Sequence, residues 1–509
     1  MVSVVRETER KYSAPTGREL PEIPDLTGVA GVAAVHDEGV RTLDARYFDT
    51  ADLRLAADGV TLRHRTGPGE HGWQLKLPVE PDVREEIRSD EAGKDPETPP
   101  AALVALTRSR TRDRPLRPVM RLTTTRAVHT LRDAAGAALA EVVRDAVSAE
   151  RADDQGSARW SEIEVELAEG SGTDLLDAVE QALLAAGLHR ADTPSKLRRA
   201  LHETGLAPVP AALPDPGPPH TAGDAVLRYL RAQAAELVAL DPAVRRGRED
   251  SVHRMRVASR RLRSALRTHR ALLDRAATEP LVDELGWFAA ELGLERDLEV
   301  LTARLRERVD TLPAELRPGP VLARLRAHER DRRRPARRAV LAALDSDRWL
   351  RLLADLDRLT ARPPLLPAAH RPPHKPLRKA VTRDFDRLAT RMDQVLRSPE
   401  GPERDVAAHA ARKAAKRLRY AAETAQLTHG KAAARYARRV RRLQDLLGAH
   451  QDAVVTRAAL RELAAEADAA GESSFAYGVL YGREERAAAD TLAALPDAWR
   501  ALRAHRRLT

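Results

Sequence analysis

A basic motif that occurs twice constrains the fold of this 509-residue chain more than any other feature. The pattern His-x-x-Arg-x-x-x-Arg-Arg-Leu-Arg begins at His253 and returns, with one Arg-to-Lys exchange, 156 residues later at His409. A Gly-x-x-x-Asp motif follows each copy, at Gly293 and again 155 residues later at Gly448. Two motifs that keep one register indicate an internal duplication, so this part of the chain should fold as two similar units.

Each copy of the basic motif predicts a positively charged stripe on a helix. The His and three cations are spaced i, i+3, i+7 and i+10, which places them along one helical face. Like charges on one face repel, so an anionic partner is the natural explanation. A lone His of this kind would be interpreted as a packing or capping residue, but the equivalent places of the two His in the two stripes make contact with a ligand an equally good interpretation. The predicted anion ligands are His253, Arg256, Arg260, Arg263, His409, Arg412, Lys416 and Arg419.

Three nearby features are predicted to be structural. Asp297 and Asp452, which end the Gly-x-x-x-Asp motifs, are expected to pair with nearby arginines rather than to bind metal. The arginine-rich run 330–338, interrupted by an Asp and a Pro, is interpreted as a solvated surface segment.

The charge is divided between two parts of the chain. Residues 1–210 hold 28 Lys and Arg against 36 Asp and Glu, whereas the rest holds 58 against 40. Such asymmetry favours two domains with different ligands. There is no cysteine, which excludes disulfides and thiolate metal sites. No apolar run reaches the length of about 18 residues that a membrane span needs, so we expect a soluble cytoplasmic protein.

Proline clusters divide the chain into domains. Residues 207–219 contain six prolines and predict a stiff, extended linker. A second cluster, residues 362–376, falls between the two basic motifs. The predicted organisation is an N-terminal domain over 1–206, the linker over 207–219, and a helical domain over 220–509 with repeats at about 220–361 and 375–505.

Before the linker, short alternating runs predict strands. After it, Ala, Leu, Arg and Glu recur with helical periodicity. A helix is expected over 174–186, where Gly187 would end it. The strand candidates are 2–12, 45–50, 60–66, 73–77, 84–88, 120–131, 138–146 and 161–167.

Several predicted strands carry charge on one face only. In 161–167, Glu162, Glu164 and Glu166 alternate with apolar residues that must pack on a core. Charge alternation on a single strand is usually a solvated face, and an open sheet would leave these groups in water. A closed antiparallel barrel would instead gather them inside. Carboxylates that bind Mg²⁺ or Mn²⁺, together with cations that neutralise phosphate oxygens, suffice for phosphoryl transfer.

The motifs of the first 205 residues resemble those of CYTH domains, the triphosphate tunnel metalloenzymes, in type and in order. The resemblance implies an eight-stranded antiparallel tunnel that hydrolyses triphosphates with Mg²⁺ or Mn²⁺. The motifs are Glu7-x-Glu9-x-Lys11, Tyr47-Phe-Asp-Thr50, Leu62-Arg-His-Arg65, Leu75-Lys-Leu-Pro78, Glu162-Ile-Glu-Val-Glu-Leu167 and Ser195-Lys196.

The resemblance also implies roles for single residues. Lys11 matches a residue that contacts phosphate and orients water, and Glu7 and Glu9 match metal-binding acids. Arg84 and Glu86 are candidates for a further Arg-x-Glu motif, and Tyr47, Phe48 and Leu62 are expected to pack the barrel. The implied phosphate ligands are Arg63, Arg65, Lys76, Arg126 (with Arg121 as its competitor) and Lys196, and the acids Asp145, Glu164 and Glu166 complete the implied metal set.

The duplicated second part resembles a CHAD domain, a helical module that binds inorganic polyphosphate. The whole chain is therefore similar to bacterial CYTH–CHAD proteins of the inorganic-triphosphatase type, with an α+β fold in which a β-tunnel precedes a duplicated all-α domain. The resemblance implies polyphosphate or tripolyphosphate as partner, and it makes association with polyphosphate granules an expectation.

Other functions stay open at this point. The chain could be a polyphosphate adaptor with an idle tunnel, or it could perform the adenylate cyclase chemistry known among CYTH relatives. Nucleic acid is a weaker candidate, because the basic part has few aromatic residues for base stacking. Tripolyphosphate, polyphosphate, thiamine triphosphate and nucleotides are alternative substrates, and nothing in the sequence indicates an oligomeric state.

Overall fold

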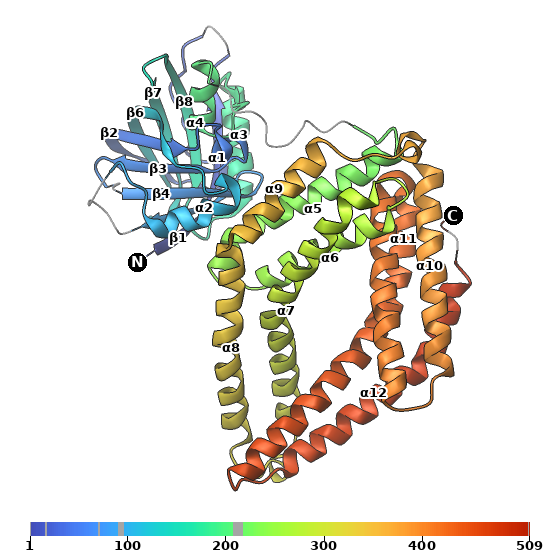
Figure 1. Cartoon of the computed structure of the whole chain (residues 1–509). Coiled ribbons are helices and arrows are strands. Elements are labelled where there is room, and N and C mark those ends of the chain that lie inside the picture. The colour runs from blue at the N-terminus through green and yellow to red at the C-terminus, as the bar shows by residue number, and fades with distance from the viewer. Residues whose placement is uncertain are drawn as a thin grey trace. The chain divides into compact units, whose positions relative to one another are not determined.

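The computed structural model describes residues 2–15, 18–69, 72–89, 96–206, 217–506 and 508. The chain divides into two compact units, Met1–Asp215 and Pro216–Thr509. In Figure 1 they run from blue to green and from green to red. The boundary falls within the predicted linker, of which residues 207–216 lie outside the described residues.

The first unit is a closed barrel of eight antiparallel strands, which confirms the predicted fold. Neighbouring strands follow the order β5-β4-β3-β2-β6-β7-β8-β1, and pairing of β1 with β5 closes the ring. A two-residue strand, β9 (His189–Arg190), extends the sheet beside the end of β1. The eight strands are β1 (Val2–Ser13), β2 (Ala34–Asp49), β3 (Thr61–Thr66), β4 (Gly72–Glu80), β5 (Val83–Ser89), β6 (Arg117–Arg132), β7 (Ala138–Arg151) and β8 (Ser157–Leu167).

The apolar core of this unit lies outside the barrel, between the strands and the helices that cover them. Ile163 and Val165 of β8, for example, pack with Leu176 and Val179 of α3. Two further clusters join β3–β5 to α2, and β6–β8 to α4. The helical elements are η1 (Val29–Gly31), α1 (Arg54–Ala57), α2 (Ala101–Thr111), α3 (Thr173–Ala185) and α4 (Lys196–Glu203). Because successive side chains of a strand point to opposite faces of the sheet, the other face of these strands points into the barrel.

The second unit is built from helices, as predicted. Gly430 interrupts α11 with φ 47° and ψ −127°, so this element is two helical segments. The two motifs of the second repeat therefore lie on consecutive segments, as those of the first lie on α6 and α7. The helices are α5 (Ala222–Arg245), α6 (Ser251–Thr268), α7 (Arg275–Asp310), α8 (Val321–Asp345), α9 (Asp347–Ala361), α10 (His374–Arg397), α11 (Pro402–Ala469) and α12 (Phe475–Arg503), with short 3₁₀ turns η2 (Ala314–Leu316) and η3 (Pro367–His370).

Two apolar clusters hold the helical unit together. A large one joins α5–α7 and α9 to α10 and α11, and includes the stacked rings of Phe288 and Trp349. A smaller one lies where the C-terminal ends of α7 and α11 meet the N-terminal ends of α8 and α12 (Figure 1). Among the described residues, no helix carries an apolar stretch long enough to cross a membrane.

Candidate functional site

The barrel encloses a cavity of about 160 Å³ that is lined almost entirely by charged side chains. Of the residues predicted to meet in the tunnel, all but Asp145 line it, and Asp145 is fully buried behind Arg126 and Lys196. The lining consists of Glu7, Glu9, Lys11, Tyr47, Thr61, Arg63, Arg65, Lys76, Arg84, Glu86, Arg88, Arg126, Glu141, Glu164, Glu166, Ser195, Lys196 and Leu197.

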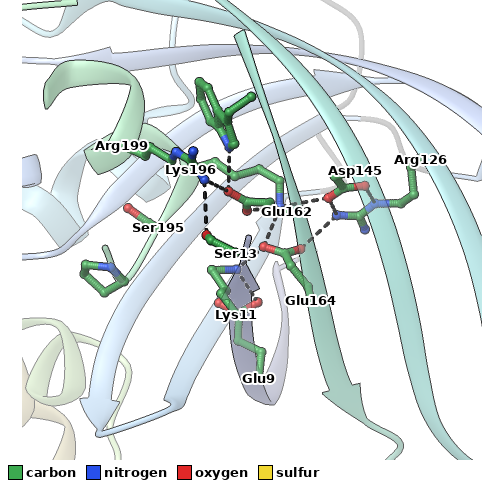
Figure 2. A network of polar contacts seen from close by, with 12 residues as sticks. Glu9, Lys11, Ser13, Arg126, Asp145, Glu162, Glu164, Ser195, Lys196 and Arg199 are labelled. Atoms are coloured by element: carbon green, nitrogen blue, oxygen red, sulfur yellow. Dashed lines mark hydrogen bonds and ion pairs between the residues drawn. The ribbon is translucent and has the colours of Figure 1, made fainter. Parts of the chain in front are cut away.

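Lys196 forms one side of this network. Ser195 caps the start of α4, its hydroxyl accepting a hydrogen bond from the backbone N–H of Arg198 at 3.2 Å. This places Lys196 at the first helical position, from which its Nζ reaches Asp145 Oδ2 at 2.9 Å and Glu162 Oε1 at 3.0 Å, and contacts Glu164 (Figure 2). Burial opposes the charge of Lys196, but the three carboxylates raise the pKa of its ammonium group. The lysine therefore stays charged at neutral pH.

Glu164 is a carboxylate that three cations of the cavity share. Arg126 binds Asp145 through two hydrogen bonds of 2.9 and 2.8 Å, and reaches Glu164 at 3.0 Å. Lys11 also contacts Glu164 and lies 3.1 Å from Glu9. Burial would raise the pKa of Glu164, but Lys11 and the other cations hold it well below its usual value. Glu164 is therefore an ionised acid in a cationic setting.

A second group of charges lies on β1, β3, β4 and β5. Lys76 Nζ is 2.5 Å from Glu7 Oε2 and 3.1 Å from Glu86 Oε2. Arg63 lies 3.6 Å from the same oxygen of Glu86. Gln74 accepts a hydrogen bond from Arg63 Nε at 2.6 Å, which fixes the guanidinium in the cavity. Glu7 and Glu86 therefore hold Lys76 and Arg63 in the region where β1 pairs with β5.

Glu166 and the exposed Glu141 are the acids of the cavity lining for which the described residues include no hydrogen-bond or ion-pair partner. Burial, followed by the negative charge of Glu7, raises the pKa of Glu166 to about 7. Glu166 also lies directly opposite Glu9 in the β1–β8 register. Acids that repel one another in a buried cavity are suited to a hard divalent cation. The described residues nevertheless contain no group of three acids or histidines already arranged as a metal site.

The structure adds residues that sequence reasoning missed or left open. Tyr47 was expected only to pack the barrel, yet it also lines the cavity, where its hydroxyl accepts a hydrogen bond from Arg63 at 3.2 Å. Arg126 points inward, whereas its competitor Arg121 is half exposed and pairs with Asp44. Glu162 holds Lys196 and accepts a hydrogen bond from Trp160 Nε1 at 2.6 Å. Strand alternation was the signal available for these residues.

In the helical unit, each Gly-x-x-x-Asp motif packs against the guanidinium group of an arginine from the basic motif. A Cβ atom added at Gly293 would lie 3.0 Å from Arg256 Nη2, and Asp297 Oδ1 accepts a bond from Arg256 Nη1 at 2.5 Å. In the second repeat, the Gly448 position faces Arg412, which lies 3.8 Å from Asp452. The predicted pairing of Asp297 and Asp452 with arginines is confirmed.

Four cations of the two basic motifs form a central cluster: Arg256 and Arg260 from α6, and Arg412 and Lys416 from α11. The described residues offer no ion pair to Arg260 or Lys416. Burial first, and the neighbouring arginines next, lower the pKa of Lys416 to about 7. Two repeats therefore bring like charges together at a partly buried point, which is unfavourable unless an anion binds there.

The other four predicted ligands lie in different surroundings. Arg419 binds Glu423 and Gln444, and Arg263 lies against Gly286. Burial, then Arg296, lowers the pKa of His253, and burial, then Lys413, lowers that of His409. The structure thus brings half of the predicted anion ligands into one cluster.

Comparison with known proteins relates each of the two units to a domain family. The model of the CYTH domain matches residues 5–201, and that of the CHAD domain matches residues 228–461. Uncharacterized proteins from two strains of Mycobacterium tuberculosis are 37% identical over 503 residues, covering 94% of this chain and 92% of theirs.

Two solved structures are also similar to parts of the chain. The CHAD domain from the plant Ricinus communis is 27% identical, with a TM-score of 0.45, and the match covers 57% of this chain and 96% of that one. PptA from Streptomyces chartreusis is 24% identical with a TM-score of 0.46, covering 55% and 99%. From the family models and the near full-length relatives, this chain belongs to the CYTH–CHAD family, with the CYTH barrel first and the CHAD helices second.

Proposed function

We propose that the barrel hydrolyses inorganic triphosphate, or a related triphosphate, with Mg²⁺ or Mn²⁺, and that the helical unit binds polyphosphate. One observation carries the first part: eight cations and six carboxylates line a single closed cavity. Phosphoryl transfer needs positioned charge more than covalent chemistry from the protein, and this cavity supplies charge of both signs.

The residues divide into a phosphate side and a metal side. The non-bridging phosphate oxygens would be bound by Arg63, Arg65 and Arg126. They would also be bound by Lys76 and Lys196, once these lysines exchange their carboxylate contacts for phosphate. Glu7, Glu9 and Glu166 would hold the metal, because hard oxygen donors suit these cations and Glu166 has no partner within the described chain. Asp145 and Glu164, also predicted metal ligands, hold Arg126 and Lys196 in the structure. We assign them to orienting these cations.

Lys11 is placed to act on both sides. Its Nζ lies between Glu9 and Glu164, so it can donate hydrogen bonds to a phosphate oxygen and to the attacking water. As an ammonium group it cannot accept a proton, and its contribution is orientation and charge stabilisation. When bound, the metal supplies charge neutralisation on the phosphate oxygens. The Tyr47 hydroxyl accepts a hydrogen bond from Arg63, so its own proton would be available to a phosphate oxygen in the cavity.

Metal removal tests the enzymatic reading. Full-length protein should release phosphate from tripolyphosphate with Mg²⁺ or Mn²⁺, stop when excess EDTA is added, and recover when metal is restored, because the acid cluster needs a cation before it accepts a polyanion. A colorimetric phosphate assay measures this. Binding of tripolyphosphate without release, whichever metal is present, would instead support a non-catalytic polyphosphate adaptor.

The second part of the proposal rests on the central cluster of Arg256, Arg260, Arg412 and Lys416. A linear polyanion neutralises several cations at once and releases their counterions. The cluster offers unpaired positive charge from both repeats at one point. Polyphosphate fits this better than nucleic acid does, because a bare phosphate chain needs no aromatic stacking surface.

Lys416 should give polyphosphate affinity a characteristic pH dependence. The pKa of Lys416 is about 7 in the free protein, and bound anion raises it. Affinity should therefore be greatest below pH 7 and fall as the pH rises above it, by up to about tenfold per unit, because binding must then take up a proton. Titrations between about pH 6 and about pH 9 measure this.

The matched control is Lys416→Arg, in which the side chain stays charged over the whole range. Titration of the ligand itself affects both proteins equally, so the difference between their pH profiles reports on Lys416 alone. Identical profiles would show that this lysine does not contact the ligand.

A further inference from the structure

The helical unit has a second charged site, a groove between α7 and α8 that reaches the start of α6. Its volume is about 1520 Å³, and nine arginines and six carboxylates line it. No aromatic side chain is among the described residues that line it. The groove is therefore positive overall and offers no surface on which a base could stack.

A stripe of arginines follows the α8 side of the groove. Arg326, Arg330, Arg334 and Arg338 are spaced four residues apart, so they follow one side of the helix over about 18 Å. All four are exposed. Within the described residues of this unit, Arg326, Arg334 and Arg338 have no ion pair or side-chain hydrogen bond. Like charges four residues apart destabilise a helix, so this stripe is unfavourable without an anion.

The internal duplication shows that the fold does not require this stripe. The offset of 155 residues between the two Gly-x-x-x-Asp motifs places Tyr481, Glu485, Ala489 and Ala493 of α12 at the corresponding positions. The helix α12 occupies the same place in the second repeat without these charges. The corresponding helix of the second repeat thus forms without the stripe, so this helical fold does not by itself call for four arginines at these positions.

The groove adjoins the basic motif of α6. Asp250 and Val252, at the start of α6, line the groove next to His253. Arg296 of α7 also lines it, and its charge is felt at the His253 imidazole. A chain that leaves the central cluster past His253 would meet the groove next.

We propose that the groove is a second subsite for linear polyphosphate, which extends the central cluster and gives the helical unit a preference for long chains. This inference rests on the proposed polyphosphate binding by that cluster. A chain of a few phosphates fills the central cluster alone, whereas a longer chain also neutralises the arginines of α8 and releases more counterions.

The test compares two ligands and two matched variants of the full chain. The groove variant is Arg326→Gln/Arg334→Gln/Arg338→Gln. The control is Arg483→Gln/Arg486→Gln/Arg503→Gln, which removes the same charge from α12. Affinities for tripolyphosphate and for polyphosphate of about 100 units are measured by calorimetry at several salt concentrations.

The groove variant should bind long polyphosphate about 10- to 100-fold more weakly, with a salt dependence reduced by about two to three ions, and should bind tripolyphosphate unchanged. The control should change both affinities less than about threefold, since its charges lie outside the groove. Equal loss in the two variants, or no loss in the groove variant, would overturn the inference. So would a groove variant that keeps its polyphosphate affinity but loses affinity for single-stranded RNA.

Failure of the underlying proposal would look different. If wild-type protein binds no polyphosphate of either length, the central cluster is not a polyphosphate site and both proposals fail. If Arg260→Gln/Lys416→Gln weakens binding while the groove variant does not, the proposed function survives and only this inference fails. Thermal unfolding of each variant shows whether the fold is retained.

Discussion

Glu7→Gln/Glu9→Gln protein should release phosphate from tripolyphosphate about 1,000-fold more slowly than the wild type, because two of the proposed metal ligands are lost from one strand. The amides keep the size of the acids, and Lys11 and Lys76 keep their contacts with Glu164 and Glu86, so the barrel should stay folded. Binding of tripolyphosphate without metal should become tighter, since the cavity loses two negative charges. An unfolded barrel would instead bind tripolyphosphate more weakly. Calorimetry alongside the phosphate assay therefore distinguishes loss of metal ligands from loss of the fold.

The matched control for this variant is Glu38→Gln/Glu150→Gln, which neutralises two exposed acids of the same barrel. It should keep wild-type turnover, because neither side chain lines the cavity. If the control and the Glu7/Glu9 variant lose activity to the same extent, net charge rather than metal binding explains the effect. If neither loses activity, the barrel is not the catalytic site.

Arg260→Gln/Lys416→Gln should weaken polyphosphate binding about 100- to 1,000-fold and also stabilise the protein. The two residues occupy equivalent positions in the two repeats, and the described residues include no ion pair for either. Loss of two partly buried cations removes two of the proposed ligand contacts, which neighbouring side chains cannot easily replace. It also removes like-charge repulsion, so the free energy of unfolding in ligand-free buffer should rise by about 1–2 kcal/mol. Calorimetry and denaturant unfolding measure the two effects.

Arg254→Gln/Lys413→Gln is the matched control, because it removes the same charge from exposed positions on the same two helices. Its polyphosphate affinity should stay within about threefold of wild type. A double variant at Arg260 and Lys416 that is less stable than wild type would mean that these cations support the helices, which contradicts their assignment as ligands.

Strand alternation made much of the barrel predictable. All eight strands and α3 lie where the sequence indicated, because each strand has an apolar face that the outer helices bury. The first part of β2, residues 34–44, was missed, since nearly all of its side chains are exposed or half-buried and show no such alternation. The helices α2 and α4 were also missed, being short and strongly polar in part.

The sequence predicted which residues belong to the candidate sites, but not which of them lie in contact. Sequence spacing places Arg260 and Lys416 on charged helical faces, but only tertiary packing of the two repeats brings them to one point. The same holds for the run 330–338, which was interpreted as solvated surface. Its arginines are exposed except for Arg337, which is half-buried and donates hydrogen bonds to the backbone of Val244 and Arg245. The helix α7 and the start of α6 make that surface one wall of a groove.

The short helix α4 joins two aspects of the barrel that could have been independent. Leu197, Ala200 and Leu201 complete an apolar cluster on the outside, while Lys196 neutralises buried acids on the inside. During synthesis this helix is the final element of the barrel unit to leave the ribosome. Until α4 packs on the barrel, Asp145, Glu162 and Glu164 lack the positive charge of Lys196. Docking of this one helix therefore both neutralises charge in the interior and covers apolar side chains on the outside.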